Sequence, residues 1–365
     1  MALIQIDFQE HKEKSYDILI GQGLIADIEK VIEHCATSNR KILFLIDETL
    51  GFNSESYARG LISKKNALVK NIKGGEKNKN LKVAQEIYNF LIGNEIDRKG
   101  IIFVIGGGVV GDVGGFVAAT YLRGIGYYQI PTTLLAMVDS GIGGKTAINI
   151  AGAKNLIGAF HQPKGVFIDI NFLKTLPKRE FAAGMAEVIK YALIVDEQFF
   201  QELEMEEVVN ANSPKLLTYI HKACEIKKSI VQKDEKDECG IRRILNFGHT
   251  FGHAIESVAG YGEYLHGEAV SIGMIVGAKL SEKLGYLSKA EVRRIETVLE
   301  KYQLPVRLKV PLKIKELIRM MQHDKKVECG ILKYVILTKI GKAKEAIDIN
   351  SDWISTLWTE IGAQG

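Results

Sequence analysis

The stretch that decides the fold is IIFVIGGGVVGD, Ile101 to Asp112. Its first five residues are an uninterrupted apolar run, which is typical of a strand buried on both faces. Gly106, Gly108 and Gly111 then satisfy the GxGxxG spacing, and a helical pattern follows. Glycines at such a turn let the backbone approach a pyrophosphate at a helix N-terminus. The pattern is typical of a dinucleotide-binding loop, and a tight strand-to-helix turn without a ligand explains the same spacing equally well.

On both sides of this stretch, the first half of the chain alternates short apolar runs with helical patterns. Lys41 to Asp47 (KILFLID) predicts another buried strand, and Asn80 to Gly93 predicts a helix between the two strands. No acidic residue follows the glycine loop at the usual distance of about 20 residues, so Asp47 is the candidate acceptor for a ribose hydroxyl. Further strand-like runs occur at Tyr127 to Ile130 and Gly165 to Ile168. This alternation predicts an α/β layer architecture.

After about Pro177 the pattern becomes mostly helical. We therefore expect two domains: residues 1–176 as a Rossmann-like α/β domain and residues 177–365 as an α-helical domain. A late apolar stretch, Tyr334 to Thr338, predicts a strand or hairpin. The amphipathic patterns lie at Phe181–Val195, Ser213–Gln232, Thr250–Ala259, Glu268–Leu284 and Lys289–Tyr302.

Composition limits the possible partners and the compartment. The chain has 365 residues, of which 46% are hydrophobic and 25% are charged, and its formal net charge is +4. This small, dispersed charge predicts neither nucleic acid nor membrane as partner. Asp7, Glu10 and Lys12 interrupt the place where a signal peptide would be apolar, and the four cysteines form no CxxC pair. We expect a cytoplasmic protein with reduced thiols.

Four residues predict a metal site: Glu187, His249, His253 and His266. His249 and His253 are four residues apart, so they share a helix face and could bind one metal ion with a carboxylate from another helix. Three nitrogen and oxygen ligands with an open position are typical of catalytic zinc. A histidine on such a helix is otherwise most often an ordinary core or surface residue.

A third set of residues predicts an anion pocket. Its cationic members stand beside small or apolar residues, and together they favour binding of a phosphate and a carboxylate. Taken one at a time, each is better explained as a solvated surface group. The cations are Arg123, Lys145, Lys154, Lys190, Lys227 and Arg242. Asp139, Asn155 and Asn246 could add hydrogen bonds to hydroxyl groups.

From about Glu76 to the C-terminus the sequence resembles the 3-dehydroquinate synthases. Long motifs carry the resemblance, and they follow the family pattern nearly throughout. They are GGGVVGDVGGFVAATYLRG (106–124), IPTTLLAMVDSGIGGKTAIN (130–149), AKNLIGAF (153–160), GMAEVIKYALI (184–194), LNFGHTFGHAIE (245–256) and LHGEAVSIGM (265–274).

The resemblance implies a fold, an activity and an assembly. The fold is an N-terminal Rossmann-like domain and a helical C-terminal domain with the active site in the cleft, usually in a homodimer. The implied reaction converts 3-deoxy-D-arabino-heptulosonate 7-phosphate, a small sugar-acid phosphate, into 3-dehydroquinate and phosphate in the shikimate pathway. It proceeds through transient oxidation at C5, phosphate elimination, re-reduction and aldol closure. The implied cofactors are NAD and a divalent metal, zinc or cobalt.

The resemblance also implies roles for individual residues. It makes Glu187, His249 and His266 the metal ligands, and it turns His253 toward the substrate instead. Arg123 is expected to reach the neighbouring subunit's site, and Lys325 or Lys326 is expected to contact the substrate. The other implied substrate residues are Asp139, Lys145, Asn155, Lys190, Lys227, Arg242 and Asn246. The implied NAD residues are Asp47, Glu76, Lys79, Gly107, Gly108, Asp112, Thr132, Thr133, Lys145 and Lys154.

Three other functions compete with this interpretation. A related sugar-phosphate cyclase, forming 2-deoxy-scyllo-inosose or valiolone, would share the fold and both cofactors. Arg123, Arg242 and Asn246 argue against it, because they suit a substrate carboxylate. A metal-dependent polyol dehydrogenase would consume NAD stoichiometrically, and the pocket lysines disfavour it. A non-catalytic nucleotide-binding regulator would not need the full set of metal and pocket residues.

Overall fold

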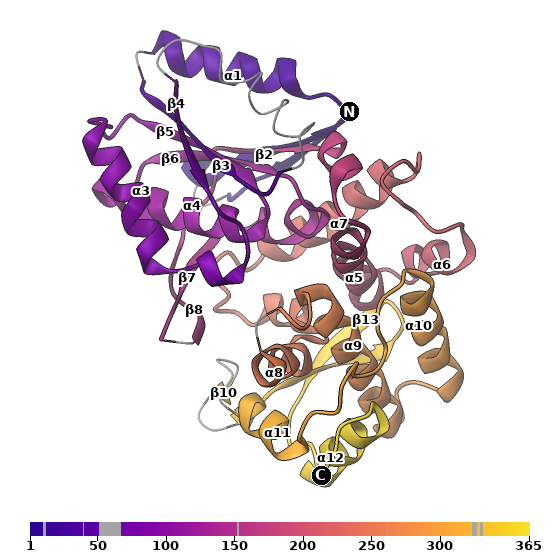
Figure 1. Ribbon diagram of the computed structural model, residues 1–365. Helices are drawn as coiled ribbons and strands as arrows, with labels where there is room; N and C mark the ends of the chain where they lie inside the picture. Colours follow the sequence, from indigo (N-terminus) through magenta and orange to yellow (C-terminus); the bar gives the residue numbers. More distant parts are fainter. Residues whose placement is uncertain are drawn as a thin grey trace. The chain divides into compact units, whose positions relative to one another are not determined.

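A computed structural model describes residues 1–9, 12–38, 40–50, 67–151, 153–260, 262–322, 327–328 and 331–365. The chain forms two compact units (Figure 1). Unit 1 comprises Met1–Pro177 and Ala211–Lys236, and unit 2 comprises Lys178–Asn210 and Asp237–Gly365. The segment Ala211–Lys236 thus differs from the division expected at residues 176 and 177. Its helix α7 (Leu216–Val231) packs on β1, β2 and the π-helical segment Ala136–Ser140. A division of the sequence at a single point cannot assign this later helix to unit 1.

Unit 1 is built on a seven-stranded sheet in which β1 is antiparallel to β2 and all other neighbours are parallel. The predicted strands and the glycine-loop turn are therefore confirmed, while β1, β2 and β4 were not predicted. In spatial order the strands are β1 (Ala2–Ile6), β2 (Tyr16–Gly21), β9 (Gly165–Asp169), β6 (Gly126–Pro131), β5 (Ile101–Gly106), β3 (Ile42–Asp47) and β4 (Ala67–Ile72).

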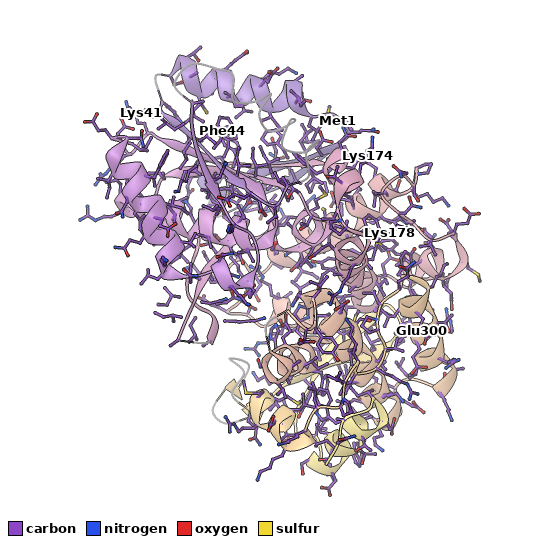
Figure 2. The ribbon with its side chains drawn as sticks, viewed as in Figure 1. Met1, Lys41, Phe44, Lys174, Lys178 and Glu300 are labelled. Atoms are coloured by element: carbon purple, nitrogen blue, oxygen red, sulfur yellow. The ribbon has the colours of Figure 1, made fainter. Side chains whose placement is uncertain are left out.

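Both faces of this sheet are covered, which explains its apolar central strands. Every residue of β3 and β5 is buried, including Phe44 of β3, which Figure 2 labels. The Phe44 ring stacks on that of Phe103, with 5.3 Å between the ring centroids. Helix α1 (Ile25–Thr37) covers one face, and α3 (Leu81–Gly93) and α4 (Gly108–Thr120) cover the other (Figure 1). The α3 helix begins where predicted, because Asn80 accepts a 3.0 Å hydrogen bond from the Val83 amide.

A two-stranded hairpin extends unit 1 beyond the sheet. Its strands are β7 (Lys145–Ile150) and β8 (Ala153–Phe160), which are antiparallel. The sequence patterns did not predict it, because the β8 residues are all partly or fully exposed and their types do not alternate between apolar and polar. The hairpin carries Lys145, Lys154 and Asn155, three of the candidate ligand-binding residues.

Unit 2 is mostly helical, as expected. The predicted late hairpin is present as β12 (Tyr334–Lys339) and β13 (Lys342–Ala346), and a second short pair is β10 (Val327–Glu328) and β11 (Ile331–Leu332). No helix among the described residues is both long enough and apolar enough to span a bilayer. The helices are α5 (Lys178–Val195), α6 (Glu197–Met205), α8 (His249–Ala259), α9 (His266–Lys283), α10 (Lys289–Lys301), α11 (Ile314–Gln322) and α12 (Ser351–Glu360).

Helix α9 is the centre of unit 2, since it packs against α5, α8, α10, α12 and β12. Two of its glycines permit backbone contact with neighbouring helices. A Cβ atom on Gly267 would lie 1.9 Å from the Ala183 carbonyl oxygen, and one on Gly273 would lie 2.0 Å from the Gly248 carbonyl oxygen. Since Gly248 immediately precedes His249, this packing fixes where α8 begins relative to α9.

We predict that Gly273→Ala destabilises the protein by about 1 to 3 kcal/mol, because the methyl group meets rigid backbone and α8 must move. Gly93→Ala is the matched control, since a Cβ there has no neighbour within 4 Å. Urea unfolding followed by circular dichroism measures both midpoints. A Gly273→Ala midpoint equal to that of the wild type would show that the α8–α9 contact is not tight.

Candidate metal centre and ligand-binding residues

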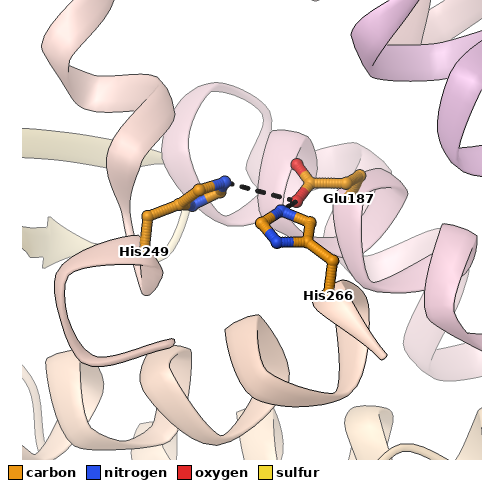
Figure 3. A group of neighbouring side chains, drawn as sticks. All are labelled: Glu187, His249 and His266. Carbon is orange, nitrogen blue, oxygen red and sulfur yellow. Dashed lines mark ion pairs between the residues drawn. The ribbon is translucent and has the colours of Figure 1, made fainter. Parts of the chain in front are cut away.

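Three side chains from three helices of unit 2 converge on one point (Figure 3). Glu187 lies within α5, while His249 and His266 are the first residues of α8 and α9. The Nε2 atoms of His249 and His266 lie 3.6 and 3.7 Å from the same atom, Glu187 Oε1. One ligand atom from each residue can be chosen so that all three lie within 4.8 Å of one another.

The geometry of this cluster fits a metal ion. Zinc binds nitrogen and oxygen ligands at about 2.0 to 2.2 Å, so two ligands of a tetrahedral ion are about 3.3 Å apart. The observed separations exceed this by a few tenths of an ångström. Glu187 is 0% exposed, and within the described part of the chain neither carboxylate oxygen has a hydrogen-bond partner. A buried carboxylate in this state requires positive charge.

Lys190 supplies part of that charge. Its Nζ atom forms an ion pair with Glu187 Oε2, one helical turn along α5, and the lysine is 1% exposed. The Nζ atom also lies 5.0 Å from the centroid of the Tyr191 ring. Because Lys190 holds Oε2 while both imidazoles face Oε1, the two oxygens of one carboxylate have different partners. This candidate substrate residue thus lies at the metal cluster.

His253 lies close to the metal cluster but is not one of its three residues. Its ring centroid is 5.5 Å from that of His249 and 6.0 Å from that of His266. It belongs to a second group of possible ligands, formed with Glu256 and His266. Glu256 was not singled out from the sequence, although it lies three residues after His253 on the same helix face. The motif HTFGHAIE therefore contained the signal, but an acidic residue on a helix is usually solvated.

In unit 1, α4 begins at the glycine loop. Gly107 is the N-cap of α4, and no side chain caps it. A Cβ atom on Gly108 would lie 2.8 Å from Ser140 Oγ, and one on Gly107 would lie 3.1 Å from Thr133 Cγ2. The Thr132 amide donates to the Gly106 carbonyl oxygen at 3.0 Å. Larger residues at Gly107 and Gly108 would therefore meet Thr133 and Ser140, and a helix N-terminus without a side-chain cap suits binding of a phosphate group.

Charged residues around the glycine loop are paired with one another. The Lys79 ammonium contacts the Asp112 carboxylate, and both are largely buried. Burial raises the pKa of Asp112, and the Lys79 ammonium opposes this shift. Asp47, at the end of β3, accepts hydrogen bonds at Oδ1 from the Thr49 amide at 2.9 Å and the Gly74 amide at 3.1 Å. These contacts fix the carboxylate orientation.

Asn149 joins two groups of candidate residues and was missed in the sequence. Its side-chain amide donates to Glu76 Oε1 at 2.7 Å, and its carbonyl oxygen accepts from the Asn155 amide at 2.9 Å. Asn155 has a φ of 53°, in the left-handed region where asparagine is tolerated. The Asn149 backbone also donates to the Lys79 carbonyl oxygen at 2.8 Å. Asn149, on β7, therefore connects the hairpin to two of the expected NAD residues, Glu76 and Lys79.

The remaining cations lie in several places. In unit 1, Lys227 is 5% exposed and contacts Asp139 Oδ1 at 2.6 Å, and Lys145 Nζ lies 5.9 Å from the Phe160 ring centroid. Arg123 has a φ of 67° and lines a surface pocket with Lys14, His161 and Lys164. In unit 2, Arg242 and Asn246 belong to the 3₁₀ segment Ile241–Asn246. The alternatives Lys325 and Lys326 lie outside the described residues.

Comparison with known proteins identifies the family of this chain. The model of the 3-dehydroquinate synthase N-terminal domain matches residues 69–183, and that of the 3-dehydroquinate synthase C-terminal domain matches residues 184–327. A 3-dehydroquinate synthase from Opitutus terrae is 45% identical over 352 residues, covering 96% of this chain and 97% of that protein. The matches therefore extend over both compact units.

Two solved structures have the same fold. The first is 2-epi-5-epi-valiolone synthase from Streptomyces hygroscopicus with NAD⁺ and Zn²⁺ bound, with a TM-score of 0.85, 28% identity and coverage of 95% of this chain and 96% of that one. The second is 2-deoxy-scyllo-inosose synthase with carbaglucose-6-phosphate, NAD⁺ and Co²⁺, with a TM-score of 0.84, 27% identity and coverage of 98% and 100%. Since the sequence is far more similar to the Opitutus protein, the chain belongs to the 3-dehydroquinate synthase family.

Proposed function

We propose that this protein is a 3-dehydroquinate synthase. It converts 3-deoxy-D-arabino-heptulosonate 7-phosphate into 3-dehydroquinate and phosphate, a step of the shikimate pathway toward aromatic amino acids. The observation that carries the proposal is the buried Glu187 carboxylate facing two imidazole nitrogens, in a chain that matches both domains of this family. The substrate is a small sugar-acid phosphate.

The cofactors are NAD and a divalent metal, zinc or cobalt. The related cyclases with solved structures hold NAD⁺ together with Zn²⁺ or Co²⁺. When bound, NAD exchanges a hydride with the C5 carbon, and the metal lowers the pKa of the substrate hydroxyl groups. Glu187, His249 and His266 would hold the metal. Asp47, Glu76, Lys79, Gly107, Gly108, Asp112, Thr132, Thr133 and Lys154 would hold NAD, while the main partner of Lys145 would be the substrate phosphate.

The chain's own residues have separate tasks in this reaction. Lys145, Lys190, Lys227 and Arg242 bind the substrate phosphate and carboxylate, and Asp139 and Asn155 accept or donate hydrogen bonds at its hydroxyl groups. His253 and Asn246 are assigned to proton transfer at the C5 oxygen. Oxidation at C5 acidifies the C6 hydrogen, and the departing phosphate, held by the lysines, removes that proton itself. The protein then needs no strong dedicated base at C6.

The assembly and compartment belong to the same proposal. We infer a homodimer in the cytoplasm, in which Arg123 of one subunit serves the site of the other. Support comes from the resemblance to the 3-dehydroquinate synthases, which are usually homodimers, and from the position of Arg123 at a surface pocket of unit 1, beside Lys14 and Lys164.

One assay tests the function against its alternatives. With the heptulosonate phosphate in large excess, we expect phosphate release to continue for many turnovers on substoichiometric NAD, with no steady accumulation of NADH. The reason is that the hydride removed at C5 must return to C5 once phosphate has left. Parallel measurement of free phosphate and of NADH absorbance checks this. One NADH formed per substrate consumed would favour a polyol dehydrogenase, and no reaction with this substrate would favour another cyclase.

A second prediction concerns Lys145. We expect Lys145→Ala to weaken substrate binding by roughly ten- to over a hundredfold, the loss of one charge-assisted contact, and to change the NAD dissociation constant little. Lys82→Ala, an exposed lysine on α3, controls for the loss of one surface charge. Isothermal titration with each ligand separates the two effects. Equal weakening of both ligands would place Lys145 at the cofactor.

A third prediction concerns the metal. Glu187→Gln should lose bound metal and activity while the protein stays folded, because it removes one of three ligands. Removing a hydrogen-bond partner of a metal ligand already costs about 10- to 100-fold in metal affinity, so removing a ligand itself should cost more. Elemental analysis after dialysis measures occupancy, with Glu204→Gln as the control, since Glu204 pairs with Arg294 instead. Full occupancy in Glu187→Gln would remove it from the ligand set.

A further inference from the structure

We propose that Glu256 is a positioning residue that orients His266 as a metal ligand. In this arrangement the Glu256 carboxylate accepts a hydrogen bond from His266 Nδ1, which leaves the Nε2 lone pair for the metal. The inference rests on the proposed metal site of Glu187, His249 and His266. It assigns a task to a buried carboxylate on α8 that the proposed reaction does not otherwise use.

The His266 ring lies between two carboxylates. Its Nδ1 atom is 3.4 Å from Glu256 Oε1, and its Nε2 atom is 3.7 Å from Glu187 Oε1. A neutral imidazole carries one N–H donor and one lone pair, so only one of these nitrogens can bind a metal. Glu256 is 8% exposed, which strengthens its hydrogen bond to the ring by limiting competition from water.

His249 shows which nitrogen faces the metal. Its Nδ1 atom is 3.2 Å from the Phe247 carbonyl oxygen, and its Nε2 atom is 3.6 Å from Glu187 Oε1. A carbonyl oxygen can only accept, so His249 Nδ1 must carry the proton. The two histidines then have the same arrangement, with Nδ1–H directed to an oxygen and Nε2 directed to Glu187. An outer acceptor of this kind fixes the tautomer and the ring orientation of a metal-binding histidine.

A competing geometry uses Glu256 itself as a ligand, together with His253 and His266. His266 cannot serve both groups, because a neutral ring has a single lone pair. Glu187 is more deeply buried than Glu256, at 0% against 8% exposure, and within the described residues its Oε1 atom lacks a hydrogen-bond partner while Lys190 pairs with Oε2. The need for a cation is therefore greater at Glu187, which favours the site with Glu256 outside the ligand set.

The test measures metal affinity directly in the full-length protein. Metal-free protein is titrated with Zn²⁺ against a coloured chelator, and with Co²⁺ while its visible d–d absorption is recorded. We expect Glu256→Ala to bind Zn²⁺ about 10- to 100-fold more weakly than the wild type. Glu256→Gln should fall between the two, because its amide oxygen can still accept from Nδ1–H but carries no charge. The Co²⁺ band of Glu256→Ala should shift, because the His266 ring is no longer held.

Glu204→Gln is the matched control, since it removes a partly buried carboxylate that pairs with Arg294 in the same unit at 2.8 Å. It should keep the wild-type Zn²⁺ affinity and Co²⁺ spectrum. Circular dichroism of the metal-free variants separates misfolding from lost affinity. If Glu256→Ala does not fold, Glu256→Gln decides, and wild-type affinity in that variant would overturn the proposal.

The remaining outcomes separate this inference from the proposed function. Wild-type affinity and an unchanged Co²⁺ spectrum in Glu256→Ala would overturn the positioning role while leaving the metal site intact. Loss of metal in Glu256→Ala with full occupancy in Glu187→Gln would instead make Glu256 a ligand, overturning both. A higher Zn²⁺ affinity in Glu256→Gln than in Glu256→Ala is the result expected of a positioning residue. A direct ligand would not give it, because a neutral amide replaces a carboxylate poorly at zinc.

Discussion

The structure of unit 2 depends on one energetic constraint, the burial of the Glu187 carboxylate. An ionised group removed from water is costly unless an opposite charge or several hydrogen bonds replace its hydration. Glu187 is 0% exposed, and the Lys190 ammonium pairs with only one of its oxygens. The other oxygen faces two imidazole nitrogens, which attract a carboxylate only when protonated or when a cation lies between them. A bound metal resolves this conflict, so the helix core is arranged around a site for it.

Backbone packing makes that arrangement possible. Gly267 brings α9 against the Ala183 carbonyl of α5, and Gly273 brings it against Gly248 just before α8. These contacts place the first residues of α8 and α9 beside the middle of α5, where Glu187 lies. A histidine at a helix start has its backbone fixed by the packing, so only ring rotation remains to be restrained. The Phe247 carbonyl does this for His249, and we assign the same task to Glu256 for His266.

Local signals predicted much of this fold, and non-local contacts account for what they missed. The buried strands β3 and β5 were evident because every residue in them is apolar or ends the strand, and Asn80 marked the start of α3. The β7–β8 hairpin was missed because its residues do not alternate between apolar and polar types. Helix α7 belongs to unit 1 because it packs on β1 and β2, which are distant from it in sequence. The candidate site residues came from motifs, whereas Asn149 and Glu256 lie in the same motifs but were recognised from the side chains that they contact.

The candidate ligand-binding residues of unit 1 are also paired with one another. Lys79 contacts Asp112, Lys227 contacts Asp139, and Asn149 connects Glu76 with Asn155. A ligand that enters such a network replaces existing contacts with new ones. Each residue then contributes to the binding free energy only the difference between its old and its new hydrogen bond. The gain is orientation: side chains already held in place lose little conformational freedom on binding. Pairing therefore lowers the affinity from any single contact, while it keeps the cofactor and substrate groups in a defined geometry.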